Sequence, residues 1–202
     1  MYKLPYFSAN NQEEILEFMH NNTFVTLIGF DGNFPVATQV PVKTVVEEES
    51  IKLIGHIMTK TDHCEAFALN PNVLAIFTGA HAYVSASVYA EPASASTWNY
   101  KTVQAKGSIK LLDSDETYNV IKDLTDKYEN TESSPAAFNK MSEDYIRKHL
   151  KAITGFEISV TNIDHVFKMS QNHSAHNKAK IVEYLEKSDD VLAQEVAKEM
   201  KG

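Results

Sequence analysis

Aromatic and hydroxyl side chains gather in residues 76–107 of this chain. The stretch holds the only tryptophan, Trp98, together with Tyr83, Tyr100 and several serines and threonines. Trp98 and Tyr100 are two residues apart in a segment with strand character, so their side chains are expected on one face. Aromatic faces beside short polar donors suit a flat heteroaromatic ligand with a polar tail. The alternative is a β-rich core seam or a dimer interface in which the rings only pack.

Two serines of this stretch share the same spacing. Ser85 and Ser87 are expected on one face of a strand, where their hydroxyls either hydrogen-bond ligand oxygens or face water. Lys168 and Gln171 are expected in a turn after the last strand. An exposed lysine in such a turn is ordinarily just solvated.

A second polar group marks the predicted start of a helix and contains Thr59, Lys60, Thr61 and His63. Backbone N–H groups and the helix dipole favour an anion such as phosphate at such a place. His56 ends the preceding strand, and its ring can donate to the ring system or the phosphate of a ligand and can change charge near neutral pH. The alternatives are an ordinary helix cap with a solvated lysine and a satisfied strand-end histidine.

No nucleophile–base or acid–base constellation stands out in the sequence. Any redox chemistry would therefore belong to a bound cofactor that the protein positions. The single cysteine, Cys64, rules out an intrachain disulfide framework and fits a reducing cytoplasm. The sequence has no CxxC, HExxH or zinc-finger spacing, so no metal site is expected.

Composition indicates a globular chain with an acidic balance. Its 202 residues suit one domain with appendages, and 19 Lys and Arg against 27 Asp and Glu give a net charge of −8. Direct DNA binding is disfavoured, because such surfaces neutralise phosphates with clustered Lys and Arg. No apolar run approaches the ~20 residues that span a bilayer. The first residues lack a signal-peptide pattern, so a cytoplasmic location is expected.

Hydrophobic periodicity predicts seven or eight strands joined mostly by short turns. The expected strands are residues 23–30, 34–44, 51–58, 73–78, 81–89, 98–112, 156–160 and 165–169. The expected helices are residues 10–20, 59–70, one that begins at Asp113 or Ser114, 142–153, 176–186 and a final short helix capped by Ser188. Asp31-Gly32 is expected to form a hairpin turn, and Thr78-Gly79-Ala80 is expected to form another.

Runs of strands with segregated helices indicate an α+β fold, mainly β, and specifically a β-barrel with peripheral helices. The Gly-rich phosphate loop of a βαβ unit is absent, which argues against a Rossmann fold. The expected organisation is a barrel domain over residues 1–175 with a helical insertion at about 114–153. A C-terminal helical tail is expected over residues 176–202.

Ordered strings of residues identify a family resemblance. They are MYKLPYF at the start, Ala37-Thr38 with Pro41, Gly55-His56, Ile76-Phe77-Thr78-Gly79, His81-Ala82-Tyr83-Val84-Ser85, Thr97-Trp98-Asn99-Tyr100, Gly155-Phe156-Glu157-Ile158 and Lys168-Met169-Ser170-Gln171-Asn172. Any one string is weak, but their shared order and spacing are specific. From Met1 to about Lys187 the chain resembles the PaiB family of FMN-binding negative transcriptional regulators. This family lies within the split β-barrel group that includes pyridoxamine-phosphate oxidases.

The resemblance implies a six-stranded split barrel that forms a homodimer, with two FMN molecules in clefts between the subunits. The phosphate would lie at the end of the third strand and the following helix, and the isoalloxazine ring would lie along the strands. The aromatic cluster and the 168–172 loop would close the cleft. The residues implied to bind the cofactor are His56, Thr59, Lys60, Thr61, His63, Tyr83, Ser85, Ser87, Trp98, Tyr100, Lys168 and Gln171.

The chain differs from the family pattern at four places, of which two are Ser96, where the family has proline, and His173, where it often has arginine. The other two are strings of residues. Thr59-Lys60-Thr61-Asp62 stands where the family carries an Arg-Ala-Asn-Pro-like string, so a bidentate arginine is replaced by a lysine, which binds phosphate as a point charge. Ser85-Ala86-Ser87-Val88-Tyr89 stands where the family carries Ser-Pro-Ser-Trp-Tyr, so one aromatic platform is lost.

The leading functional expectation is an FMN-binding protein of the PaiB type that acts as a transcriptional regulator or as a flavin-dependent oxidoreductase. The residues leave open whether it is an enzyme. The alternatives are a haem-binding or haem-degrading split barrel and an interaction module without a cofactor.

Overall fold

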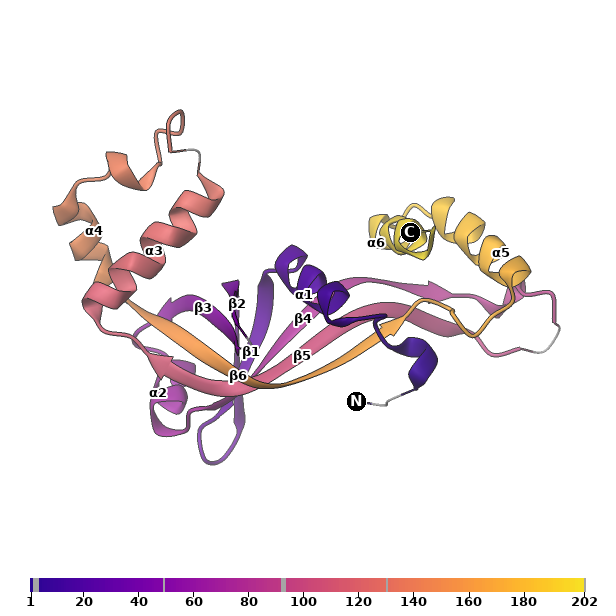
Figure 1. Cartoon of the computed structure of the whole chain (residues 1–202), viewed down its shortest axis with the longest axis horizontal. Coiled ribbons are helices and arrows are strands. Elements are labelled where there is room, and N and C mark those ends of the chain that lie inside the picture. The colour runs from indigo at the N-terminus through magenta and orange to yellow at the C-terminus, as the bar shows by residue number, and fades with distance from the viewer. Residues whose placement is uncertain (2–3, 49, 92–93, 130, 202) are drawn as a thin grey trace. The chain divides into compact units, whose positions relative to one another are not determined.

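Six strands of the chain close into a barrel in the order β1-β2-β3-β6-β5-β4 (Figure 1). The computed structural model describes residues 1, 4–48, 50–91, 94–129 and 131–201. The strands are β1 (Phe24–Phe30), β2 (Pro35–Glu47), β3 (Ser50–Met58), β4 (Asn72–Val84), β5 (Thr97–Leu111) and β6 (Ile153–Lys168). β1 pairs antiparallel with β2 and β4, and β3 pairs antiparallel with β2 and β6. The mainly-β, α+β class is therefore confirmed.

Helices precede, interrupt and follow this strand order. They are α1 (Gln12–Asn21), α2 (Asp62–Leu69), α3 (Ser114–Tyr128), α4 (Glu143–Leu150), α5 (Ala175–Glu186) and α6 (Val191–Lys201), with the short 3-10 helices η1 (Pro5–Phe7), η2 (Ala86–Val88) and η3 (Phe138–Lys140). The capping signal at the start of α3 is confirmed: the Asp113 side chain accepts from the N–H of Glu116, and the Glu116 side chain accepts from the N–H of Asp113.

The last helix begins later than expected. The Asp190 side chain accepts from the N–H of Leu192 at 2.9 Å, so the capping contact belongs to Asp190. The prediction that Ser188 caps this helix is wrong, because the Ser188 hydroxyl instead accepts from the N–H of Asp190.

The predicted hairpin turn between β1 and β2 is confirmed. Gly32 has a φ of +102°, which only glycine adopts without strain. The Asp31 side chain accepts from the N–H groups of Asn33 and Phe34 at 2.7 and 2.6 Å. These two bonds close the turn and lower the pKa of the Asp31 carboxyl.

β4 is one strand, so the predicted turn at residues 78–80 is wrong. Gly79 lies within the strand, where a Cβ atom would come within 2.7 Å of the Phe18 ring. The glycine therefore serves the close packing of α1 on β4 and not a change of chain direction. The strand ends at Val84, where η2 follows.

β6 is also one strand, so the predicted turn at residues 162–164 is wrong. The polar stretch that suggested a turn has no buried residue between Ser159 and His165. The backbone nevertheless continues as a strand through this stretch. The two uninterrupted strands reduce the predicted count of seven or eight to six.

The described residues fall into two compact units. The barrel unit contains residues 19–77 and 104–163, and the terminal unit contains residues 1–18, 78–103 and 164–202. β4, β5 and β6 contribute residues to both. The predicted boundary at residue 175 stays a prediction, while α3 and α4 do lie in the chain between β5 and β6 as expected.

In the barrel unit the buried side chains alternate along the strands. Val25 and Leu27 of β1 and Leu53 of β3 are fully buried, as expected for one inward face of a barrel. α2 packs against β1, where the Phe67 ring fills the space beside Gly29. This contact fixes the place of the α2 helix, whose first turn carries the predicted anion group.

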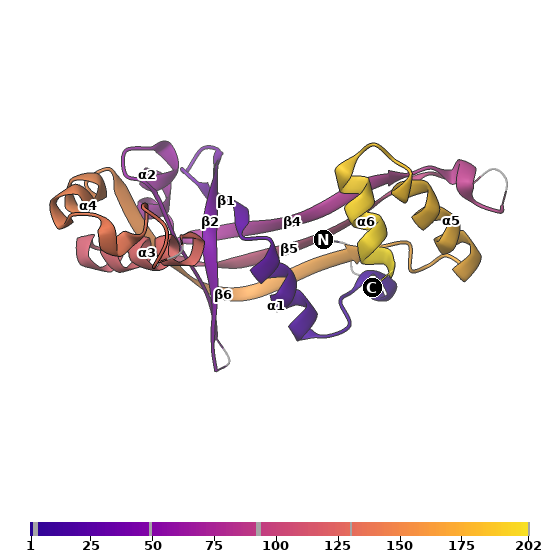
Figure 2. The same ribbon diagram turned by 90° about the horizontal axis from the view of Figure 1, so that it is seen from above.

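In the terminal unit α5 and α6 pack on one face of the ribbon formed by β4 and β5 (Figure 2). The packed side chains are small on the strands and larger on α5, as with Ala80, Ala82, Ile181 and Leu185. This packing leaves the opposite face of the ribbon to the exposed aromatic residues described below.

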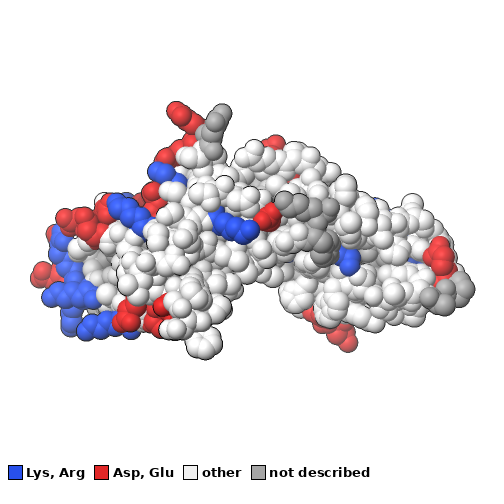
Figure 3. Space-filling view, turned by 90° about the horizontal axis from the view of Figure 1, so that it is seen from below, with Lys and Arg blue, Asp and Glu red and all other residues white. Residues whose placement is uncertain are grey.

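On the face drawn in Figure 3, several Lys and Arg side chains gather at the end that carries α3 and α4, and Asp and Glu side chains lie beside them. Arg147 of α4 forms ion pairs with Glu143 at 2.8 Å and with Asp115 at 3.4 Å. Within the described part of the chain, no helix is long and apolar enough to cross a membrane.

Candidate functional site

The first turn of α2 is held by the Thr61 side chain. Its hydroxyl donates to the carbonyl of Met58 at 2.9 Å and accepts from the N–H of Cys64 at 3.4 Å. Thr61 is therefore both the N-cap of α2 and the link back to the end of β3. α2 therefore begins at Asp62, three residues later than the predicted range of 59–70.

Both ring nitrogens of His63 meet oxygen atoms. Nε2 lies 3.0 Å from the Thr61 hydroxyl, whose own hydrogen is directed to the Met58 carbonyl. Nδ1 lies 3.2 Å from Asp62 Oδ1, which also accepts from the N–H of His63 at 2.8 Å. Each ring nitrogen can donate to the oxygen that it faces when it carries a hydrogen. The α2 start thus combines an imidazole ring with a carboxylate that already covers one backbone N–H.

The Thr59 side chain contacts β6, whereas the Lys60 side chain is exposed. The Thr59 hydroxyl lies 3.1 Å from the Thr154 hydroxyl of β6, and the Thr59 N–H donates to the carbonyl of Ala152 at 2.9 Å. Lys60 is exposed and makes no ion pair with any described residue. Its ammonium group is therefore available to an anionic ligand. Thr59, Thr61 and His63 with Lys60 are called the α2 group below.

His56 lies on the face of the sheet that α3 covers. It pairs with Gly155 across β3 and β6, and directly paired residues share one face. The N–H of Gly155 donates to the hydroxyl of Thr117 of α3 at 2.9 Å. His56 Nδ1 is buried without a hydrogen-bond partner in the described structure, and burial lowers the pKa of the imidazole. His56 therefore lies beneath α3.

The exposed aromatic cluster lies on the β4–β5 ribbon of the terminal unit. The Trp98 ring packs 5.8 Å from the Tyr83 ring and 6.2 Å from the His81 ring, measured between centroids. Trp98 is 52% exposed and Tyr83 is 48% exposed, although they are large aromatic side chains. Tyr100, two residues along β5, shares the face of Trp98 as predicted. Tyr83, Trp98 and Tyr100 are called the aromatic group below.

Ser85 and Ser87 do not lie on a strand, so that expectation is wrong. β4 ends at Val84, and Ser85 caps η2 by accepting from the N–H of Ser87 at 3.2 Å. The two hydroxyls contact each other at 2.8 Å. Ser85 is half-buried and Ser87 is exposed.

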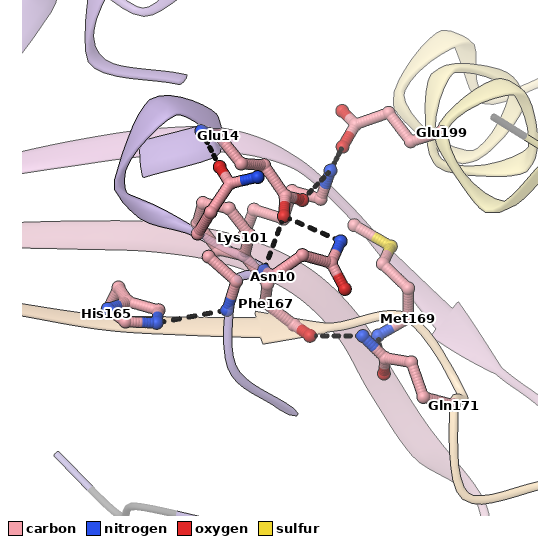
Figure 4. A network of polar contacts seen from close by, with 10 residues as sticks. Asn10, Glu14, Lys101, His165, Phe167, Met169, Gln171 and Glu199 are labelled. Carbon is pink, nitrogen blue, oxygen red and sulfur yellow. Dashed lines mark hydrogen bonds and ion pairs between the residues drawn. The ribbon is translucent and has the colours of Figure 1, made fainter. Parts of the chain in front are cut away.

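The end of β6 carries two further predicted residues. Lys168 Nζ donates to the Thr97 hydroxyl and lies 5.6 Å from the centre of the Phe7 ring. Gln171 closes the following turn: its Oε1 accepts from the N–H of Met169 at 2.7 Å, and its Nε2 donates to the carbonyl of Phe167 at 2.5 Å (Figure 4). The Gln171 amide therefore holds the turn in place.

Sequence reasoning missed a buried polar pair beside the aromatic group. Asn99 is 0% exposed, and its Oδ1 accepts from the Ser170 hydroxyl at 3.0 Å. Ser170 is 1% exposed and has a φ of +57°, an unusual value for a residue other than glycine. Both residues belong to strings quoted for the resemblance, and the alternation of Asn99 with Trp98 is the signal that would have placed it on the buried face.

The α2 group belongs to the barrel unit and the aromatic group belongs to the terminal unit. No described set of three His, Cys, Asp or Glu residues is arranged to hold a metal ion. The first group offers a lysine and a histidine at a helix start, and the second offers exposed rings. These are the chemical requirements of an anionic tail and of a planar aromatic system.

Comparison with known proteins supports the same chemistry. Residues 1–162 match the model of the family described as "Putative FMN-binding domain". The chain is 30% identical over 201 residues to the protease synthase and sporulation protein PAI 2 of Bacillus subtilis, covering 100% of this chain and 97% of that protein.

Solved structures share the fold. The FAD and haem binding protein from Mycobacterium smegmatis has a TM-score of 0.61 at 15% identity, covering 85% of this chain and 78% of that chain. The flavocytochrome Anf3 from Azotobacter vinelandii has a TM-score of 0.62 at 12% identity, covering 83% and 72%. The split-barrel fold and the PaiB-type resemblance expected from the sequence are thereby confirmed. The chain belongs to the FMN-binding domain family that its first 162 residues match.

Proposed function

We propose that this protein binds FMN as its cofactor. The family match over residues 1–162 carries this proposal. Each residue group supports it separately, because FMN contains both a phosphate and a flat aromatic ring system. When bound, the flavin supplies one- or two-electron transfer, and the protein binds and orients it.

The α2 group is proposed to bind the phosphate. Lys60 supplies an exposed ammonium group, and His63 adds an imidazole with ring nitrogens at the helix start. The Asp62 carboxylate accepts from the N–H of His63 and therefore lies at the start of the helix. Its negative charge repels a phosphate bound there. We therefore expect a phosphate site that is weaker than one with a bidentate arginine.

The aromatic group is proposed to contact the isoalloxazine ring. Trp98 and Tyr83 already form an exposed edge-to-face pair on one face of the ribbon. Stacking on such rings needs no charged partner and suits the uncharged flavin. The other predicted contacts stay proposals: His56, Thr59, Ser85, Ser87, Lys168 and Gln171.

We propose that the assembly is a cytoplasmic homodimer and that the bound flavin gives it an oxidoreductase role. A regulatory role, which the family resemblance of the sequence implies, is the alternative. Direct DNA binding is disfavoured by the net charge of −8 and by the mixed charges around α3 and α4. Light scattering after size exclusion tests the dimer, and a mobility shift at low salt with its own promoter region tests DNA binding.

The test of FMN binding uses the single tryptophan. The purified protein is titrated with FMN, and the emission of Trp98 and of the flavin are followed together. We expect saturable quenching of Trp98 and a flavin spectrum in the as-purified protein. A colourless sample whose Trp98 emission does not respond to added FMN would overturn the proposal and favour an interaction module without a cofactor.

Haem is the second candidate ligand. The observation in its favour is that one similar structure is named for haem binding and the other is named a flavocytochrome. The described residues show no cluster of metal ligands, and haem would depend on a single histidine such as the exposed His81. A haem titration with a shifted Soret band would support this candidate, and the absence of a shift would exclude it.

A further inference from the structure

Asn99 is fixed from behind the aromatic face. Its side chain points to the buried face of β5, opposite to Trp98, because consecutive strand residues alternate. There its Oδ1 accepts from Ser170, and its Nδ2 donates to the sulfur of Met200 in α6 at 3.3 Å. Asn99 thus joins β5 both to the turn after β6 and to the C-terminal helix.

Lys101 is fixed on the same face, one alternation further along β5. Its ammonium group lies 3.0 Å from Glu199 of α6 and 3.9 Å from Glu14 of α1, and 5.1 Å from the centre of the Phe167 ring (Figure 4). Its side chain is 18% exposed, so these pairs lie in a partly desolvated setting. Two adjoining residues of α6 therefore contact two alternate residues of β5.

Thr97 completes the row, since its hydroxyl accepts from Lys168. The residues on either side of Trp98 and of Tyr100 are therefore each anchored on the back of the strand. An anchored backbone leaves an aromatic side chain only its own χ rotations, which lowers the entropy lost when a ligand stacks on it. Burial of the Trp98 side chain itself does not fix its ring, because half of its surface is exposed.

We propose that α6 is a positioning element for Trp98, acting through the contacts of Met200 with Asn99 and of Glu199 with Lys101. Residues 191–201 lie beyond the part of the chain that matches the family model. For flavin affinity the inference rests on the proposed function, whereas the fixed orientation of the indole ring does not depend on it. Asn99 and Lys101 are positioning residues, since they act through the strand.

The test removes both α6 contacts and keeps side-chain size, with the double variant Glu199→Gln/Met200→Leu. Trp98 is the only tryptophan, so intrinsic fluorescence reports its ring alone. We expect lower fluorescence anisotropy and stronger acrylamide quenching of Trp98 in the protein without FMN. We expect the Kd for FMN to rise about three- to tenfold, as for the loss of one hydrogen bond and one ion pair.

The matched control is Glu195→Gln, which removes a charge from an exposed residue of the same helix that has no ion-pair partner among the described residues. Circular dichroism and thermal unfolding verify that each variant is folded, and Glu199→Gln alone replaces the double variant if that variant does not fold. Unchanged Trp98 anisotropy in a folded variant would overturn the inference. A third outcome separates the two proposals: Trp98 becomes more mobile in the variant, but the unaltered protein does not bind FMN. That result would uphold the positioning role of α6 and overturn the proposed function.

Discussion

Replacing Asp62 by asparagine should tighten the binding of FMN. In the structure the Asp62 carboxylate accepts from the N–H of His63 and faces the His63 ring, so it covers a donor that a phosphate would use. It also repels a phosphate through its charge. The Asp62→Asn variant would keep an acceptor for the N–H and lose the charge, so the change isolates the electrostatic effect.

The size of the effect follows from Coulomb's law. Two unit charges about 5 Å apart repel by about 0.8 kcal/mol in water and by about 3 kcal/mol at an effective dielectric constant of about 20. The Asp62 side chain is 78% exposed, so the value for water applies more closely. A phosphate monoester carries about −1.5 to −2 charges, which gives about 1–2 kcal/mol, or about five- to thirtyfold in Kd.

Isothermal titration of the protein without FMN measures the effect, with riboflavin as the matched ligand because it lacks the phosphate. Asp62→Asn should tighten FMN and leave riboflavin unchanged. Glu65→Gln removes the same charge three residues further along α2, away from the His63 contact, and should change FMN affinity much less. The reasoning is refuted if Asp62→Asn leaves FMN affinity unchanged, or if it tightens riboflavin to the same extent.

Three other predictions concern charge, acid stability and packing. Lys60→Gln should weaken the binding of FMN about fivefold at low salt and less at high salt, because salt screens an exposed point charge. The binding of riboflavin should not change. An equal loss of FMN affinity at both salt concentrations would contradict this prediction. His165 Nε2 accepts from the N–H of Ala9 at 3.0 Å, and burial lowers the pKa of the imidazole. The folded protein therefore binds fewer protons than the unfolded chain, so this contribution to stability is complete above about pH 6.5 and is lost as pH falls through the folded value. Urea unfolding at several pH values should show a smaller acid loss for His165→Gln than for the unaltered protein, and equal losses would speak against the assignment. Gly79→Ala should destabilise the fold by about 1–3 kcal/mol, because the added Cβ would lie 2.7 Å from the Phe18 ring. The midpoint of urea unfolding measures this loss. An unchanged midpoint would show that the Phe18 ring moves aside freely.

Local signals in the sequence were sufficient for much of the fold. β1 and β3 follow their predicted ranges to within a residue, because alternating side chains and the Asp31-Gly32 turn are encoded by neighbours in the chain. The start of α3 was likewise readable from the Asp113 cap. Errors arose where a distant contact overrides a local signal. Gly79 suggests a turn in the sequence, but its reason is the Phe18 ring of α1.

For the candidate site, the sequence supplied residue types but not all of their surroundings. Trp98 and Tyr100 share a face of β5 as their spacing predicted, whereas the ring contact of Tyr83 with Trp98 and the Thr61 cap were not predicted. The position of His56 under α3 depends on the register between β3 and β6, which no local pattern reveals. The Gln171 amide is occupied by backbone groups that only the folded turn brings to it.

The most direct measurement of the central claim is an inventory of the ligand that the protein carries when it is purified. The folded protein is denatured, and the released small molecules are identified and counted by mass spectrometry. We expect FMN in a fixed ratio to the chain, or a stoichiometric return of FMN when the emptied protein is incubated with it. A chain that releases no flavin and takes up none, while its barrel remains folded, would contradict the account.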